Sequence, residues 1–184
     1  MRPGIVRACD YSIGQRSQLL TAKNSRTSME TKIWTIGHSN RTVEEFIKLL
    51  DTRGIQLVVD ARTVPFSRAN PQFNRPALAL ALSRVGIDYV WRGRNIGGLG
   101  ENVDQEKTID ELIEVADNVP MAVMCSEARP QDCHRYTTLT PLFEARGVEV
   151  EHILWDPSDD VRGGLFNDIA GSSNGRTPPA KGGN

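Results

Sequence analysis

The sequence lacks an apolar run long enough to cross a membrane, since no stretch approaches the ~18 residues that a spanning helix requires. It has only 3 cysteines, an odd and sparse number that fits a reducing compartment better than a disulfide framework. These two absences predict a cytoplasmic protein without a membrane partner. The remaining composition, 39% hydrophobic and 24% charged in 184 residues, is typical of one globular domain with loose ends.

Lysine is absent from residues 61–94, although this segment is basic. The segment contains six arginines and only Asp88 as an acid. Because the guanidinium fork matches phosphate and carboxylate, the cluster predicts a site for a planar or bidentate anion. Surface salt bridges to acidic helices are the alternative explanation. A non-catalytic nucleic-acid-binding module that uses this segment is a second possible function.

Short apolar runs alternate with amphipathic segments through residues 29–156, which predicts a single α/β domain. Strands are expected at 32–37, 55–62, 87–91, 121–125 and 148–154, and helices at 41–54, 77–86, 108–118 and 133–147. The pairs Thr42–Glu45 and Thr108–Glu111 have the spacing of capping boxes, and Pro141 predicts a kink or a late break. Such alternation implies a mainly parallel sheet with helices on both faces, a Rossmann-like or flavodoxin-like sandwich.

At the two ends of the chain, apolar residues do not recur with the period of a helix or a strand. Residues 1–28 have an acid-poor composition with Arg and Ser, which fits a disordered extension or a start assigned upstream of Met29 better than a transit peptide. Residues 157–184 end in a segment rich in Gly, Pro, Ser and Asn, and we expect this tail to be disordered.

Polar and reactive residues follow four of the predicted strands, at the edge where open parallel sheets bind ligands. The acid, base and nucleophile candidates are His38, Asp60, Cys125, Glu127 and His134. The candidates for ligand binding are Gly37, Ser39, Arg62, Ser67, Arg68, Gly97, Gly98 and Arg135. Asp60 and Arg62 are two apart on a strand and therefore point to one face. Phe66, Phe73 and Trp91 could stack a base, or could be ordinary packing.

The glycine-rich loop RGRNIGGLGE, which follows the third predicted strand, could hold a phosphate through its backbone N–H groups. It lacks both the dinucleotide-binding spacing and the P-loop spacing. A flexible loop therefore explains it equally well.

The segment MCSEARPQDCHR, residues 124–135, allows three interpretations. Cys125 could be a nucleophile, although Arg129 comes too early and Arg135 too late for a phosphatase loop. A zinc ion could be bound by Cys125, Cys133, His134 and His38, although the cysteine spacing is unusual for zinc. In the favoured interpretation Cys133 is a small buried hydrophobe, while Glu127, His134 and Arg135 form a binding constellation. The role of Cys125 stays open.

Four segments in this order, TIGHSNRTVEEFIKLL, VVDARTVPFSRANPQFN, IDYVWRGRNIGGLG and MCSEARPQDCHR, resemble the bacterial and archaeal family known as domain of unknown function 488. The resemblance covers about residues 32–155. It implies an α/β fold and the site residues named above, together with Pro65 and Phe73. The family lends no established reaction, cofactor or metal.

Together these features predict an enzyme-like pocket at the carboxyl ends of the strands. Its ligand is expected to be phosphorylated or otherwise anionic, such as a nucleotide or a nucleic-acid fragment. A zinc-binding protein is the remaining alternative. The cofactor, the reaction and the oligomeric state do not follow from the sequence.

Overall fold

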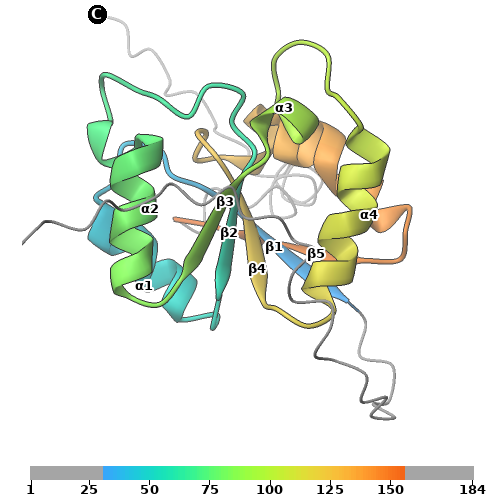
Figure 1. The fold of residues 1–184 in the computed structure, drawn as a ribbon, viewed down its shortest axis with the longest axis horizontal. Coiled ribbons are helices and arrows are strands. Elements are labelled where there is room, and N and C mark those ends of the chain that lie inside the picture. Colours follow the sequence, from blue (N-terminus) through green and yellow to red (C-terminus); the bar gives the residue numbers. More distant parts are fainter. Residues whose placement is uncertain (1–30, 156–184) are drawn as a thin grey trace, which may run out of the picture.

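The five predicted apolar runs pair side by side as parallel strands in the computed structural model, which describes residues 31–155 (Figure 1). The strands are β1 (Lys32–Gly37), β2 (Leu57–Asp60), β3 (Asp88–Trp91), β4 (Met121–Cys125) and β5 (Glu149–Ile153). The extensions predicted at residues 1–28 and 157–184 lie outside the described residues.

The sheet has the order β3-β2-β4-β1-β5, and every pairing is parallel. The predicted α/β sandwich is therefore confirmed. Strand β4 lies between β2 and β1, whereas the Rossmann order has β1 beside β2. As a result the loops that follow β1, β2 and β4 leave the sheet from three adjacent strands at its carboxyl edge.

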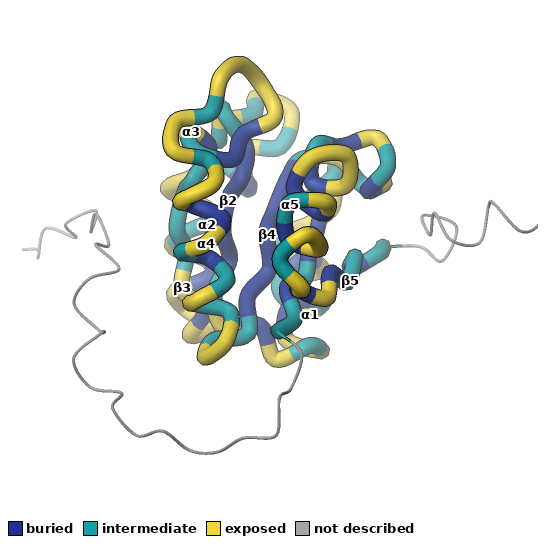
Figure 2. The backbone as a smooth tube through the Cα atoms, turned by 90° about the vertical axis from the view of Figure 1, so that its right-hand side faces the viewer, coloured by how far each residue is buried: buried dark blue, intermediate teal, exposed yellow. Residues whose placement is uncertain are grey.

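Helices cover both faces of the sheet. They are α1 (Val43–Asp51), α2 (Arg75–Arg84), α3 (Gly93–Ile96), α4 (Gln105–Ala116) and α5 (Thr140–Glu144). Helices α1 and α2 bury Phe46, Leu50, Leu78 and Leu82 against one face, and α4 and α5 bury Ile109, Leu112 and Phe143 against the other. Figure 2 shows the inner strands β2 and β4 buried between exposed outer helix faces. Two separate apolar layers thus hold the sheet.

Local sequence signals explain some helix boundaries and fail at others. The capping box of Thr42 and Glu45 is confirmed at the start of α1. The one predicted at Thr108 is wrong, because α4 already begins at Gln105, after Asp104 in a left-handed conformation with φ 52°. Thr108 is instead buried inside the helix. Helix α3 was not expected within the glycine-rich loop.

At Pro141, where the sequence predicts a kink or a late break, the helix changes type without stopping. Residues Arg135–Leu139 form a π-helical turn, and α5 follows with Pro141 in its first turn. The backbone N–H of Thr140 donates to the carbonyl oxygen of Arg135 and closes the wider turn, and the Thr140 hydroxyl donates to the same oxygen over 2.7 Å. Proline has no N–H to continue the ladder, so the change of helix type occurs beside it.

Within residues 31–155, no helix combines the length and the apolar character that a membrane crossing needs.

Candidate functional site

The residues that follow the strands point to two sides of the sheet. Ile36, Val58 and Met124 pack beneath α1 and α2, and side chains two positions further along face the same way. These are His38, Asp60 and Ser126. Cys125 follows Val123, which packs beneath α4 and α5. The carboxyl edge therefore carries two distinct groups, one on each side.

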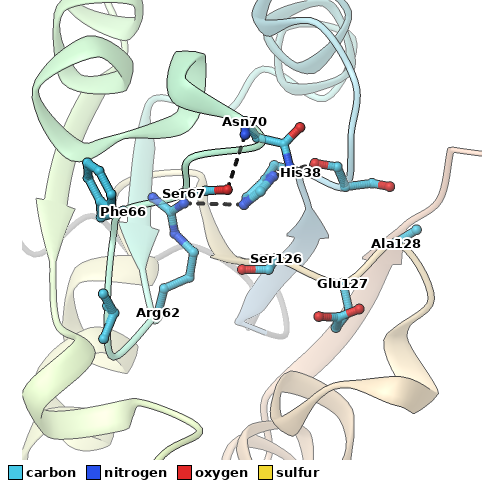
Figure 3. A pocket seen from close by; sticks show the side chains of 10 residues that line it. His38, Arg62, Phe66, Ser67, Asn70, Ser126, Glu127 and Ala128 are labelled. Carbon is cyan, nitrogen blue, oxygen red and sulfur yellow. Dashed lines mark hydrogen bonds between the residues drawn. The ribbon is translucent and has the colours of Figure 1, made fainter.

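A pocket of about 280 Å³ opens on the side of α1 and α2 (Figure 3). The loops after β1, β2 and β4 form its walls. Six lining residues were candidates from the sequence, namely His38, Ser39, Arg62, Phe66, Ser67 and Glu127. The other four are Val64, Asn70, Ser126 and Ala128. Three of the four predicted strand ends thus meet in one pocket.

His38 is a buried wall of this pocket, with 3% of its surface exposed. Its Nδ1 lies 2.6 Å from the carbonyl oxygen of Ser39, and its Nε2 lies 3.2 Å from Nη1 of Arg62. A carbonyl oxygen can only accept, so Nδ1 carries the proton and Nε2 accepts from Arg62. Burial, with the Arg62 charge as a smaller cause, lowers the pKa of His38 to about 4. The imidazole is therefore neutral at physiological pH.

Asp60 fixes the orientation of Arg62. The guanidinium donates from Nε to Oδ1 over 2.9 Å and from Nη2 to Oδ2 over 2.6 Å, and Nη2 also donates to the carbonyl oxygen of Phe73. The Asp60 oxygens accept two further bonds, from the Arg62 backbone N–H and from the Tyr89 hydroxyl. The sequence suggested Asp60 as an acid or base. Its complete burial and full set of donors make it an orienting carboxylate instead.

The buried carboxylate of Asp60 raises the pKa of both of its side-chain partners, Arg62 and Tyr89. Burial lowers the pKa of Arg62, but hydrogen bonds and charge from Asp60 outweigh it and leave the pKa raised. Burial and the neighbouring carboxylate raise the pKa of Tyr89. Tyr89 is therefore a neutral donor and Arg62 a permanent cation facing the pocket.

Arg135 shapes the loop after β4 rather than holding a ligand. It is completely buried and donates from Nη1 to the Glu127 carbonyl oxygen over 2.5 Å and from Nη2 to that of Ala128 over 2.7 Å. Burial lowers its pKa. The prediction that Arg135 holds an anion is corrected on this ground. Its bonds place the exposed Glu127 side chain beside the pocket.

Gly37 lets this loop cross the end of β1. A Cβ at Gly37 would lie 1.6 Å from the Glu127 carbonyl oxygen and 2.4 Å from Nη1 of Arg135. Only a glycine allows two backbones to approach so closely. The glycine predicted as a ligand contact is thus a packing requirement.

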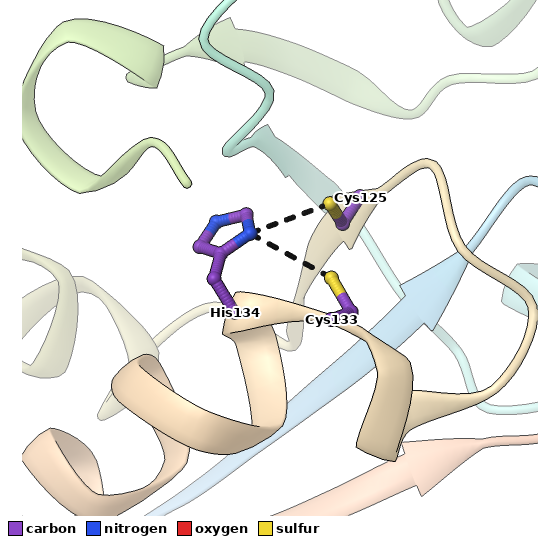
Figure 4. A group of neighbouring side chains, drawn as sticks. All are labelled: Cys125, Cys133 and His134. Carbon is purple, nitrogen blue, oxygen red and sulfur yellow. Dashed lines mark hydrogen bonds between the residues drawn. The ribbon is translucent and has the colours of Figure 1, made fainter. Parts of the chain in front are cut away.

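A second group lies on the other side of the edge and contains Cys125, Cys133 and His134 (Figure 4). Each sulfur lies 3.6 Å from Nδ1 of His134. Both cysteines are buried, as one interpretation of the sequence expected. The pKa of Cys133 is lowered, chiefly because the Cys125 thiol donates a hydrogen bond to it. The same contact, together with burial, raises the pKa of Cys125, which is unfavourable for a nucleophile.

His38 does not belong to this second group, because its ring nitrogens face Ser39 and Arg62. The predicted set of four zinc ligands is therefore reduced to three.

The glycine-rich loop packs against this second group and not into the pocket. A Cβ at Gly97 would lie 2.3 Å from the Gly93 carbonyl oxygen and from Oγ1 of Thr63. A Cβ at Gly98 would lie 2.6 Å from Nδ1 of His134. The expectation that these glycines contact the same ligand as His38 is corrected by their place in the fold.

The remaining candidates are Arg68 and the three aromatic residues, and they differ in how far their side chains are exposed. Arg68 is exposed and does not line the pocket. Phe73 is fully buried and stacks on the His38 ring, with centroids 4.3 Å apart. Trp91 donates to the Arg62 carbonyl oxygen and lies beneath the Arg75 guanidinium. Phe66 is 61% exposed and lines the pocket, so it is the stacking candidate that keeps a free face.

Sequence reasoning missed Tyr89, Asn70 and Ser126. Tyr89 reaches Asp60 from the neighbouring strand, which only the strand order reveals. Asn70 donates its backbone N–H to the Ser67 hydroxyl. Ser126 could have been found, because it lies two positions after the apolar Met124 and so shares its face.

The neutral, buried His38 predicts that the fold weakens in acid. Its pKa is about 4 in the folded chain and roughly 6.5 when unfolded, so the unfolded state binds the proton first as pH falls. Stability is fully present above pH ~6.5 and decreases down to pH ~4, by about 3 kcal/mol in total. We expect His38→Gln, which keeps an acceptor for Arg62, to flatten this part of the curve in urea unfolding at each pH. An unchanged slope between pH 6.5 and 4 in the variant would exclude His38 as its source.

One of the comparisons with known proteins finds a family. Residues 42–107 match the family model described as Domain of unknown function DUF488, which confirms the resemblance across α1, β2, α2, β3, α3 and the start of α4. His38 and the segment 124–135 lie outside the matched residues. No curated protein and no solved structure matches the chain.

Proposed function

We propose that the pocket binds a small ligand with one anionic group, such as a mononucleotide or a nucleic-acid end, that Glu127 takes a proton from this ligand, and that His38 holds Arg62 toward it. The observation that carries the proposal is the neutral His38, bonded to the fixed Arg62 and sharing a pocket with Glu127. A carboxylate can accept a proton as a general base, whereas both ring nitrogens of His38 are already bonded, to Ser39 and to Arg62. Glu127 and the His38–Arg62 pair come from different strand ends and meet at the pocket.

The charge of the pocket limits the ligand. Arg62 is the one cation among its lining residues, and Glu127 adds a negative charge. A triphosphate would therefore meet too little positive charge. Asp60, Phe73 and His38 engage all but one N–H of the Arg62 side chain, and this last N–H, on Nη1, can donate to a single phosphate group. The volume of about 280 Å³ is also near the lower end for ligand pockets, roughly 300 Å³.

Polar groups and one aromatic side chain complete the proposed binding surface. Ser39, Ser67 and Ser126 bring hydroxyl groups to the pocket, and these can donate to phosphate or sugar oxygens. The exposed ring of Phe66 offers a face on which a base could stack. These features favour a nucleotide over a bare inorganic anion.

The rival function, a nucleic-acid-binding module, has less support from the distribution of the arginines. Arg62 is buried against Asp60, and Arg84 lies in the last turn of α2, the end that leads into the start of β3. The six arginines of residues 61–94 therefore do not share one surface. Such a module would show binding that weakens steeply with salt and forms no product.

Glu127→Gln separates these functions. The chain would be incubated with nucleoside monophosphates and short single-stranded oligonucleotides, with products detected by mass spectrometry and binding by calorimetry. We expect turnover to fall by about 10²-fold or more, while the affinity for the ligand changes little. Glu114→Gln, an exposed glutamate of α4, is the matched control and should behave as the unchanged chain. Normal turnover in Glu127→Gln would refute its role, and salt-sensitive binding without any product would favour the rival.

A further inference from the structure

Cys125, Cys133 and His134 form a group that the proposed function does not use. Their two sulfurs and one ring nitrogen all lie within 4.8 Å of one another. The side chains converge from the end of β4 and from the segment that leads into α5 (Figure 4). Both cysteines are buried and His134 is partly exposed, so the group lies at the edge of the core and is open on the side of the histidine.

The two sulfur-to-nitrogen distances within this group are those of a tetrahedral metal site. Zinc binds thiolate sulfur at about 2.3 Å and imidazole nitrogen at about 2.0–2.1 Å. At the tetrahedral angle these bond lengths separate a sulfur ligand from a nitrogen ligand by about 3.6 Å. The separation from Nδ1 of His134 is 3.6 Å for Cys125 and 3.6 Å for Cys133. One ion could therefore bind all three atoms with little movement.

The orientation of His134 is also that of a metal ligand. Its Nε2 lies 3.1 Å from the carbonyl oxygen of Ile96. Because that oxygen can only accept, Nε2 carries the proton and the lone pair of Nδ1 faces the two sulfurs. Ligating histidines commonly donate their second N–H to such a carbonyl, which fixes the tautomer and the ring.

The sulfur of Cys133 has a further partner that suits a thiolate. The backbone N–H of Arg135 donates to it over 3.5 Å. The guanidinium of Arg135 is fully buried and donates to the carbonyl oxygens of Glu127 and Ala128, which fixes this residue beside Cys133. A thiolate at Cys133 would thus keep a positioned backbone donor.

We infer that Cys125, Cys133 and His134 bind one zinc ion, which leaves the fourth coordination position to water or to a ligand from outside this set. Two thiolates and one imidazole form a soft ligand set that suits zinc and excludes magnesium or calcium. Three protein ligands with one open position are the arrangement of catalytic zinc sites. His38 takes no part, which separates this site from the pocket.

The first test measures metal in the untagged, reduced full chain. We expect about one zinc per chain by elemental analysis after expression with zinc, and a tetrahedral cobalt(II) spectrum with sulfur-to-metal charge-transfer bands after exchange. The cobalt spectrum reports thiolate ligation without any variant. A chain that is folded by circular dichroism but binds no stoichiometric zinc, and gives no such cobalt spectrum, overturns the inference.

Variants then assign the ligands. Cys133→Ser and His134→Gln should each reduce the zinc affinity by 10-fold or more, whereas Cys9→Ser, at the remaining cysteine of the chain, should leave it unchanged. His38→Gln should also retain the zinc, because His38 is bonded elsewhere. Zinc that persists in both Cys133→Ser and His134→Gln would place the ion at another site and refute the assignment. The pocket proposal is unaffected by either result, since its test uses ligand binding and Glu127.

Discussion

Asp60→Asn is expected to destabilise the fold by about 3–5 kcal/mol, the usual effect of removing one partner from a buried ion pair. Asp60 is fully buried and Arg62 almost so. The substitution leaves the Arg62 guanidinium without a counter-ion. The NH2 group of the new asparagine would also face Arg62 and Tyr89, which are themselves hydrogen-bond donors. The urea midpoint should fall accordingly, with little change in the slope of the unfolding free energy against urea.

The matched control for Asp60→Asn is Glu149→Gln, which removes one carboxylate from the partly exposed ion pair with Lys32. We expect a loss below about 1 kcal/mol there, because exposed pairs contribute little. The double variant Asp60→Asn/Arg62→Met should recover part of the stability, since no unpaired charge is left behind. Equal effects of Asp60→Asn and Glu149→Gln would contradict the buried-pair interpretation.

Gly37→Ala is expected to be the second large effect, about 3 kcal/mol or more, at the upper end for overpacking. Its Cβ would lie 1.6 Å from a backbone oxygen, which cannot rotate away as a side chain could. The loop after β4 would have to move, and Glu127 with it. Thermal or urea unfolding measures the loss of stability, and ligand affinity should fall in the same variant because the pocket wall shifts.

Gly147→Ala provides the control for Gly37→Ala. Gly147 has φ 78° and no atom within 4 Å of its added Cβ, so only the conformational penalty of about 1–2 kcal/mol applies. The difference in unfolding free energy between the two variants measures the cost of crowding where the loop after β4 crosses the end of β1. Comparable losses in the two variants would show that the crowding at Gly37 is relieved at little cost.

Four of the five strands could be predicted from sequence to within one residue at each end, because buried parallel strands are nearly continuous apolar runs. The second was predicted too long, at 55–62, whereas β2 spans Leu57–Asp60. The bounds of β1 and β4 agree with the prediction at both ends. The start of α4 could not be predicted in the same way. The helix begins after Asp104, which takes a left-handed conformation, and the capping-box pattern at Thr108 gives no sign of this. Strand order is set by long-range packing and has no local signal.

The candidate site was predicted in part for the same reason. His38, Arg62 and Glu127 follow strand ends, so the rule for parallel sheets brings them to one edge. The rule does not say on which side of the sheet a loop lies. For this reason the sequence grouped Gly98 and Cys125 with the pocket, while the structure places them in the other group.

Partners buried behind the pocket were the hardest to foresee. The roles of Asp60 and Arg135 depend on hydrogen bonds to backbone and to a tyrosine of a neighbouring strand. In sequence alone, a carboxylate or an arginine at a strand end is equally compatible with binding a ligand. Their burial, a property of the packed fold, distinguishes the two cases.

The central claim is that the pocket formed by the loops after β1, β2 and β4 binds a ligand with a single phosphate. The most direct measurement is a crystal structure of the chain soaked with nucleoside monophosphates and with inorganic phosphate. The account predicts density in the pocket, with the phosphate at Arg62 and within reach of His38 and Glu127. A pocket without density across the whole panel, or a nucleotide bound instead over the exposed arginines, would contradict it.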